Sequence, residues 1–284
     1  MSKAKGFDVI VLMSHALRHY TKEVAVGIGF LLVYVPTFLW MWDRWFVRDS
    51  YYSHGILIPF VTVYLIWQQR DELVKMTPKS SPWGMRLIIL GIAIHLVSSL
   101  FRVYFSSGFS MLVVLAGLIL HFYGLNILRK IWFPIFFLVF MIPVPMVLIT
   151  NISFQLKIFA AKIATFALNN MRMHAIREGS IIKMQHAYVI VDDVCSGLRS
   201  LITLVALGSI FAYWMKSRLT KRIILLLSTI PIAVITNVVR VIFLATVSEV
   251  WGAKYATGFT HDVSGFIVFA LAFVLLFAVG RLLE

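Results

Sequence analysis

Three side chains in the C-terminal part of the sequence could together break a peptide bond. Cys195 is the one cysteine of the chain, Arg240 lies inside an apolar run, and His261 begins another apolar run. Acyl transfer through a thioester requires a thiol nucleophile, a proton-transfer group and a cation that stabilises an oxyanion. In this interpretation Cys195 attacks a carbonyl, His261 passes the proton to the leaving amine, and Arg240 holds the developing oxyanion.

The residues around Cys195 would have opposite effects on the stability of its thiolate. We expect Cys195 at the outer start of a helix, where free N–H groups and the positive dipole end favour a thiolate. Arg199, one turn further on, would act the same way, whereas Asp192 and Asp193 would oppose it. Arg199 also competes with Arg240 as the catalytic cation. We prefer Arg240, because an arginine deeper in a membrane is harder to explain structurally.

Two further residues are candidates for supporting roles. Asn237 precedes Arg240 by three residues and therefore shares its helical face. His54 competes with His261 for the role of base, although we favour the interpretation that Tyr52-Ser53-His54-Gly55 shapes a helix start. The histidines show no metal-like spacing and a single cysteine excludes a multi-cysteine site, so we expect neither metal nor cofactor.

These residues belong to a chain that is too apolar for a soluble fold. Of its 284 residues, 61% are hydrophobic and 13% are charged, against about 45–50% and about 25% in a soluble domain. A soluble fold of this length would expose apolar patches far beyond a few hundred Å². The composition excludes a soluble enzyme, a coiled coil and a disordered chain. It predicts an all-α, polytopic integral membrane protein with a single domain over 1–284.

Apolar runs predict about eight transmembrane helices. They lie at roughly 24–42, 53–68, 87–105, 110–126, 131–149, 197–215, 223–247 and 263–280. The first run is too long for a signal-peptide core and ends without small residues, so we expect it to be retained.

The segment 150–196 is expected to be extracytoplasmic. Within it, 152–170 places Gln155, Lys162, Thr165 and Asn169 on one helical stripe. That pattern favours an amphipathic helix in the interface over a spanning one, with a re-entrant path left open. The β-branched run 181–191 predicts a short β-hairpin at the membrane surface, within 171–194.

The charge distribution predicts the orientation. Lysines and arginines number 26 against 12 acidic residues, a formal net charge of +14, which we assign to cytoplasmic loops and not to nucleic-acid binding. The basic segments 70–86, 129–130 and 216–222 all fall inside if eight helices span and 152–170 does not. Both termini are then cytoplasmic, and Cys195, Arg240 and His261 face the extracytoplasmic side.

Several motifs together resemble the exosortases and the related archaeosortases. In the C-terminal part they are Val194-Cys195-Ser196-Gly197-Leu198-Arg199-Ser200, Asn237-Val238-Val239-Arg240-Val241, and His261 followed by Gly265. In the N-terminal part they are Trp45, Asp49, Tyr52-Ser53-His54-Gly55, Pro59, Trp67, Arg70 and Pro143-Val144-Pro145. One departure is Ser50, which follows Asp49 where a proline is common and bears on loop shape.

The resemblance implies a multi-spanning cysteine transpeptidase of a bacterial or archaeal cytoplasmic membrane. Such enzymes process membrane-anchored exported proteins with a C-terminal sorting signal, made of a short motif, a transmembrane helix and a basic tail. The resemblance assigns the catalytic roles to Cys195, Arg240 and His261. It leaves open the acceptor of the thioester, whether water, a lipid or a sugar amine.

Three other functions remain alternatives at this point. A transporter or channel would explain buried polar residues but predicts paired broken helices or an inverted repeat, which the sequence does not show. A membrane acyltransferase or a protease without transpeptidation would share the nucleophile. A non-enzymatic component of polysaccharide export would need no Cys195 at all.

Overall fold

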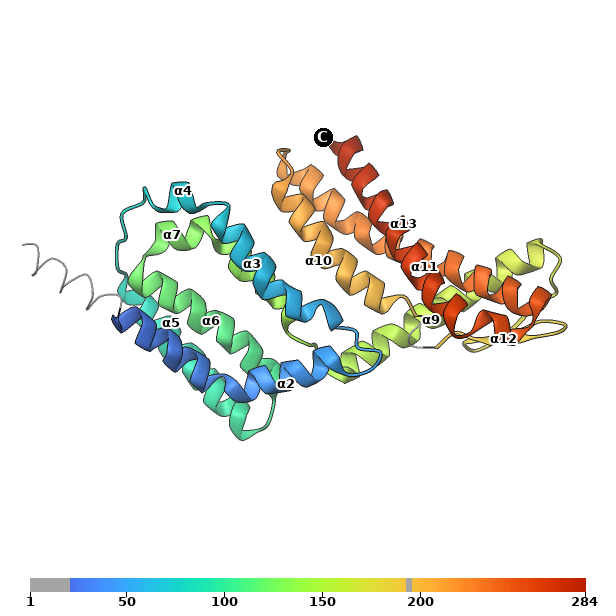
Figure 1. The fold of residues 1–284 in the computed structure, drawn as a ribbon, viewed down its shortest axis with the longest axis horizontal. Helices are drawn as coiled ribbons and strands as arrows, with labels where there is room; N and C mark the ends of the chain where they lie inside the picture. The colour runs from blue at the N-terminus through green and yellow to red at the C-terminus, as the bar shows by residue number, and fades with distance from the viewer. Residues whose placement is uncertain (1–20, 193–195) are drawn as a thin grey trace, which may run out of the picture.

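The computed structural model describes residues 21–192 and 196–284, and most of these residues are helical. The predictions for Cys195 and Asp193, and for the basic N-terminus, lie outside the described residues. Figure 1 shows two groups of helices side by side, one formed by the elements up to α8 and the other by α9 to α13.

The first group begins with a helix that is bent at Tyr34. The segments Thr21–Val33 and α2 (Val35–Phe46) meet at 58°. Pro36, at the start of α2, has no N–H to donate and its ring clashes with the preceding turn, which explains the bend. The remaining elements are η1 (Ser53–Ile56), α3 (Leu57–Trp67), α4 (Arg70–Leu73), α5 (Pro82–Leu100), α6 (Tyr104–Phe122), α7 (Leu125–Lys130), α8 (Trp132–Phe137) and η2 (Leu138–Met141).

The second group is arranged around α11. Its elements are α9 (Met146–Asn170), β1 (Ile176–Glu178), β2 (Ile181–Lys183), β3 (Tyr188–Ile190), α10 (Leu198–Trp214), α11 (Leu219–Trp251), α12 (Ala253–Ala256) and α13 (Phe259–Leu283). Helix α11 contacts α9, α10 and α13. The strands form an antiparallel sheet in the order β1-β2-β3, where the sequence predicted a single hairpin. Ile182 of β2 is fully buried in a cluster with α9 and α11.

The structure supports fewer membrane spans than the sequence predicted. Five described helices are long and apolar enough to cross a membrane, or six if the bent first helix is counted as one span. The remaining predicted spans correspond to shorter apolar helices, Ser53–Trp67, Trp132–Met141 and Leu198–Trp214. The predicted count of eight is therefore not confirmed.

The largest difference from the predicted spans lies at Pro143-Val144-Pro145. The predicted span 131–149 ends as a helix at Met141, and α9 begins at Met146 because the two prolines interrupt the helix. Helix α9 itself is long and apolar enough to span, although 152–170 was expected in the interface. Figure 1 shows α9 crossing the direction of α10 and α13 instead of running alongside them.

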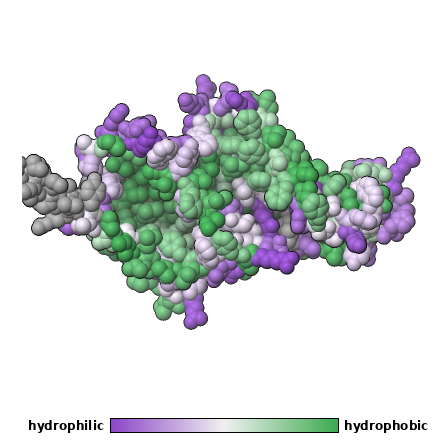
Figure 2. Space-filling model, in the orientation of Figure 1, coloured by the Kyte–Doolittle hydropathy of each residue, from purple (hydrophilic) through white to green (hydrophobic). Residues whose placement is uncertain are grey.

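The surface of the molecule is that of an integral membrane protein. Large apolar side chains face outward on many helices, including Leu100 at 79% and Phe266 at 78% exposure. Figure 2 shows hydrophobic residues over much of one face, with hydrophilic residues along its upper and lower edges, at its right-hand end and in one group right of the centre. Such a surface is stable in a bilayer and would aggregate in water.

Helix α10 joins the two groups through two stripes of residues. Thr203, Ile210 and Tyr213 face the N-terminal group, where the Tyr213 ring stacks on Phe133 with centroids 4.1 Å apart. Leu204 and Ala212 face the cluster with α11 and α13. Since the two stripes lie on opposite sides of the helix, neighbouring residues at its start face different halves of the protein.

Candidate active site

Arg240 is held inside the second group by α13. Its side chain projects from the middle of α11, and the residue is 8% exposed. Nε donates to Ser264 Oγ at 3.2 Å, and Nη2 donates to the His261 carbonyl oxygen at 3.0 Å. Ser264 Oγ in turn donates to the same carbonyl at 2.7 Å, which fixes the first turn of α13. The guanidinium therefore has a defined position.

The His261 ring lies against the same guanidinium. Arg240 Nη2 and His261 Nε2 are 3.1 Å apart, and because arginine can only donate, Nε2 is the acceptor. That assignment places the ring proton on Nδ1, which lies 3.3 Å from Asp262 Oδ1. The His261 side chain is 25% exposed. The structure thus brings Arg240 and His261, 21 residues apart, into direct contact.

Gly265 gives the guanidinium room on α13. A Cβ at this position would lie 3.4 Å from Arg240 Nη2. Gly265 lies one helical turn after His261 and belongs to the motif that resembles the family. In the structure the group beside it is Arg240, so a branched side chain there would displace the guanidinium.

The start of α10 lies on the same part of α11. Gly197 precedes the helix with φ +81°, and a Cβ there would be 2.8 Å from Cβ of Asn237. Asn237 is 4% exposed and lies one turn before Arg240. Ser196, also buried, accepts a hydrogen bond from the Leu198 N–H through its hydroxyl. The chain that directly follows Cys195 is therefore one helical turn of α11 away from Arg240.

Arg240 is a buried cation whose described partners are all uncharged. None of the ion pairs formed within 21–192 and 196–284 includes Arg240; its hydrogen bonds go to a hydroxyl, a carbonyl and an imidazole. These bonds use Nε and Nη2, so Nη1 can donate to a further acceptor. In the same part of the chain, no three His, Cys, Asp or Glu side chains come close enough to hold a metal ion.

Arg240 lies further from the end of its helix than the sequence indicated. The predicted span 223–247 placed it about 10 Å from the outer end. In the structure α11 continues to Trp251, eleven residues beyond Arg240, which is about 16 Å. At 33 residues, or about 50 Å, α11 is longer than the roughly 30 Å hydrocarbon core, so part of it extends beyond the bilayer.

Arg199 lies in a different environment from Arg240. Its Nη2 is 3.4 Å from Asp49 Oδ1, in the loop after α2, and its side chain is 35% exposed. Helical spacing predicted Arg199 on the face of Cys195. Helix α10 begins only at Leu198, after the left-handed Gly197, so helical spacing does not apply across these positions, and Cys195 itself lies outside the described residues. Arg199 therefore connects α10 to the N-terminal group.

His54 is also directed to α10 and not to Arg240. Its Nδ1 lies 3.3 Å from Thr203 Oγ1, while Nε2 is buried without a hydrogen-bond partner among the described residues. The neighbouring Gly55 lies flat against Trp45, since a Cβ at Gly55 would be within 2.2 Å of the indole nitrogen. The Trp45 indole N–H donates to the Met141 carbonyl at 2.9 Å. These contacts favour a packing role for Tyr52-Ser53-His54-Gly55.

The loop between α2 and η1 is ordered by its own polar side chains. Ser50 Oγ donates to the Arg44 carbonyl at 2.6 Å and accepts the Tyr52 N–H at 2.9 Å. Ser50, the departure from the family pattern, thus closes this turn with its hydroxyl. Burial raises the pKa of the Tyr52 hydroxyl, which is hydrogen-bonded to the backbone of Val144. The loop is thereby attached to the Pro143-Val144-Pro145 segment.

The small sheet is attached to the far end of α11 by a carboxylate. Glu249 accepts hydrogen bonds from the backbone N–H groups of His186 and Ala187, at 3.1–3.2 Å, and its Oε1 lies 2.9 Å from His186 Nδ1. Neither Ser264 nor Glu249 was among the residues singled out from the sequence. Ser264 could have been found, because its spacing of three from His261 places it on the same helical face.

One comparison with known proteins identifies a family. A family model described as a transmembrane exosortase matches residues 42–278, most of the chain. This match confirms the resemblance drawn from the motifs. No curated protein and no solved structure matches the chain.

Proposed function

We propose that this chain, which belongs to the transmembrane exosortase family, cleaves and transfers peptide chains through a thioester on Cys195. The observation that supports this most directly is the contact of Arg240 with His261 beside the start of α10. Helices α11 and α13 and the start of α10 there supply a buried cation, an imidazole and the residues that follow the one cysteine. Those are the components of acyl transfer.

In the first half-reaction the Cys195 sulfur attacks the carbonyl carbon of the scissile peptide bond. The thiol proton passes to His261 Nε2, and the carbonyl oxygen becomes an oxyanion. Collapse of this intermediate breaks the C–N bond, and His261 returns the proton to the leaving amine. A thioester between the substrate and Cys195 remains.

Arg240 has two tasks in this mechanism. Nη1 donates to the oxyanion, where a preorganised donor in a dry site is most effective. Nη2, which contacts His261 Nε2 at 3.1 Å, must turn away from the ring when Nε2 takes a proton. The attraction of the guanidinium to the oxyanion favours that movement, so formation of the oxyanion and release of Nε2 occur together.

The thioester is then resolved by a nucleophile. A lipid or sugar amine would give transpeptidation, and water would give hydrolysis. The substrates in this proposal are exported proteins held in the membrane by a C-terminal sorting signal, with the site on the extracytoplasmic side of a bacterial or archaeal cytoplasmic membrane. The sheet β1–β3 lies beside α11 and could pair with an extended recognition motif by strand addition.

The single cysteine allows a direct test. The protein is co-expressed with an exported reporter that carries a short motif, a transmembrane helix and a basic tail, and processing is followed by gel shift. We expect the wild type to process the reporter and form a hydroxylamine-sensitive adduct, and Cys195→Ala and Cys195→Ser to do neither. Because no other thiol is present, alkylation of the purified protein reports on Cys195 alone.

Two outcomes distinguish this function from the alternatives. Processing that continues in Cys195→Ala would overturn the enzyme assignment and favour a transport or scaffold role. Cleavage with a thioester adduct, but with free carboxylate as the one product when amine acceptors are supplied, would retain the nucleophile and exclude transpeptidation. Ser217→Ala, in the loop between α10 and α11, is a control that should leave processing unchanged.

A further inference from the structure

A second site lies apart from Arg240 and His261, in a cavity of about 540 Å³. The end of α2 and the loop after it form one wall, the turn between α5 and α6 forms another, and Pro143–Met146 closes the third side. Neither Arg240 nor His261 lines it. Its volume falls within the range of about 300–1,000 Å³ that is usual for small-molecule sites.

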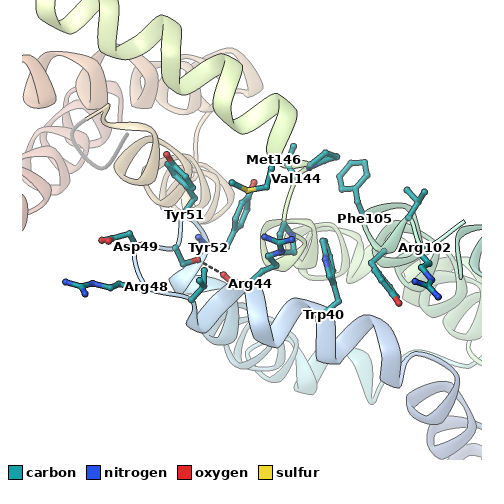
Figure 3. Close-up of a pocket in the computed structure, with 16 residues that line it drawn as sticks. Trp40, Arg44, Arg48, Asp49, Tyr51, Tyr52, Arg102, Phe105, Val144 and Met146 are labelled. Atoms are coloured by element: carbon teal, nitrogen blue, oxygen red, sulfur yellow. Dashed lines mark hydrogen bonds between the residues drawn. The ribbon is translucent and has the colours of Figure 1, made fainter. Parts of the chain in front are cut away.

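The cavity is lined by an excess of positive charge. Arg44, Arg48 and Arg102 line it together with a single carboxylate, Asp49, which already pairs with Arg199 at 3.4 Å. The Arg44 guanidinium forms no hydrogen bond or ion pair that involves another described residue. Figure 3 shows it beside Trp40 and below Val144, whereas Arg48 and Arg102 extend outward at the two ends. Arg44 is thus the cation available to a ligand inside.

The cavity lies at the level of a membrane surface. Arg102 is in the turn between α5 and α6, two helices of 19 residues that are each long enough to span. The opposite ends of these helices are joined by a hydrogen bond from the Lys79 N–H to the Tyr123 carbonyl, next to the basic helix α7 (Figure 1). The three arginines therefore lie at the other end of the α5–α6 pair, away from that basic region. The preference of lysine and arginine for cytoplasmic loops does not explain their position there.

The remaining lining is typical of the boundary between headgroups and acyl chains. Trp40 and Tyr104 stack with ring centroids 6.0 Å apart, and aromatic rings of this kind prefer the membrane interface. Val47, Phe105 and Met146 add apolar surface next to the arginines. A ligand that fits this lining has an anionic group for Arg44 and an apolar part that stays in the bilayer.

We propose that this cavity binds the phosphate of a phospholipid headgroup, with Arg44 as the direct contact and Arg102 at the rim. A guanidinium presents two parallel N–H groups that match a phosphate. The lipid reaches the cavity from the membrane at the level where its phosphate resides, and its acyl chains lie against the exposed apolar surface of α2 and α5. This inference does not depend on the proposed transpeptidation.

The test uses delipidated full-length protein and native mass spectrometry. Phosphatidylglycerol is titrated against wild type, Arg44→Gln and Arg177→Gln, the last being a matched control in the sheet, outside the cavity. We expect Arg44→Gln to weaken binding about ten-fold or more, the loss typical of a charge-assisted hydrogen bond, and Arg177→Gln to leave it unchanged. Arg44→Lys, which keeps the charge but not the two parallel N–H groups, should recover only part of the affinity.

Competitors identify the source of the anion. Diacylglycerol with the same acyl chains lacks the phosphate and should not compete. Equal binding of diacylglycerol, or equal affinity of wild type and Arg44→Gln, would overturn the proposal. Displacement of the lipid by inorganic phosphate at the same concentration, or by an acidic peptide, would assign the site to a soluble anion and overturn its lipid assignment.

Arg102→Gln, in the exposed turn, is the second variant should Arg44→Gln not fold. We expect it to lower the affinity for phosphatidylglycerol several-fold.

Discussion

The two groups of helices both bury polar side chains, but they do so in different ways. In the first group Thr37 and Ser107 hydroxyls are 2.5 Å apart, His95 Nδ1 is 2.8 Å from Ser107 Oγ, and the Tyr34 hydroxyl is 3.0 Å from Ser110 Oγ. These residues are at most 6% exposed and connect α2, α5 and α6. In the second group the buried polar centre is Arg240.

The two groups differ in whether their buried polar side chains are neutral or charged. Neutral hydroxyl and imidazole groups satisfy one another, and in a membrane such pairs hold helices together with about 0.6 kcal/mol each. A buried guanidinium costs several kcal/mol unless an anion offsets it, yet the described partners of Arg240 are uncharged. In the proposed mechanism, the oxyanion that forms during the reaction is the charge partner of this cation.

The largest expected effect is the loss of that cation. Arg240→Ala should lower processing of the reporter by about two orders of magnitude or more, the usual effect of removing an oxyanion donor. Arg240→Lys should recover little, because lysine cannot replace two differently directed N–H groups. The rate of processing in membranes is the measurement, and the alkylation rate of Cys195 checks that the protein remains folded.

Arg199→Ala provides the matched comparison for Arg240→Ala. Arg199 pairs with exposed Asp49 at 3.4 Å, and exposed ion pairs contribute only about 0–1 kcal/mol. We therefore expect processing to fall far less than in Arg240→Ala. If Arg199→Ala were the more damaging of the two, the assignment of the catalytic cation would have to be reversed.

An intermediate effect is expected where α10 meets α11. Gly197→Ala introduces a Cβ 2.8 Å from Cβ of Asn237 at φ +81°. The left-handed conformation costs an alanine about 1–2 kcal/mol, and the clash moves the start of α10 away from Arg240. Since a displacement of about 1 Å can lower a rate up to about a hundred-fold, we expect a loss of processing approaching that size.

Gly179→Ala is a control that introduces backbone strain without displacing the start of α10. Gly179 also has positive φ, +63°, but a Cβ there would meet nothing within 4 Å. Thermal unfolding should show a small loss of stability in Gly179→Ala and a larger one in Gly197→Ala, which adds a clash, whereas processing should fall only in Gly197→Ala. Equal activity of the two variants would show that the contact of Gly197 with Asn237 does not position the site.

The smallest effect is expected in the hydroxyl network. Thr37→Val and Ser107→Ala should each lower stability modestly, and a double-mutant cycle should give a coupling of about 0.6 kcal/mol. Processing by the single variants should match the wild type, because these residues only connect helices. A ten-fold loss of processing in Thr37→Val would remove the distinction between the two groups of helices.

Two of the candidate site residues singled out from the sequence lie together in the structure, whereas the local structure around a third was predicted less well. Arg240 and His261 were singled out by their position in apolar runs, and they are in contact. Arg199 was placed beside Cys195 by extending a helical period backwards across Gly197. The period does not extend that far, since α10 begins at Leu198. Local spacing gives the face of a residue only within one continuous helix.

The predicted transmembrane spans show the same limit of local sequence patterns. The apolar run 131–149 was read as one helix, but Pro143 and Pro145 divide it, and α9 begins at Met146. The fully buried Ile182 fits the β-branched pattern that predicted strand structure in 171–194, while the attachment of His186 to Glu249 joins residues 63 positions apart. Hydropathy reports how apolar a segment is, but not which distant side chains contact that segment in the folded protein.

By itself the sequence determined that the protein is embedded in a membrane, which family it belongs to, and which side chains are candidates for a reaction. These properties follow from composition and residue type, which are local. Only the tertiary structure decided which arginine meets His261. That choice depends on the rotation of α10 after Gly197, on the contact of Gly197 with Asn237, and on the packing of α13 against α11. Helix rotation and packing are set by contacts between distant segments, so no local pattern contains them.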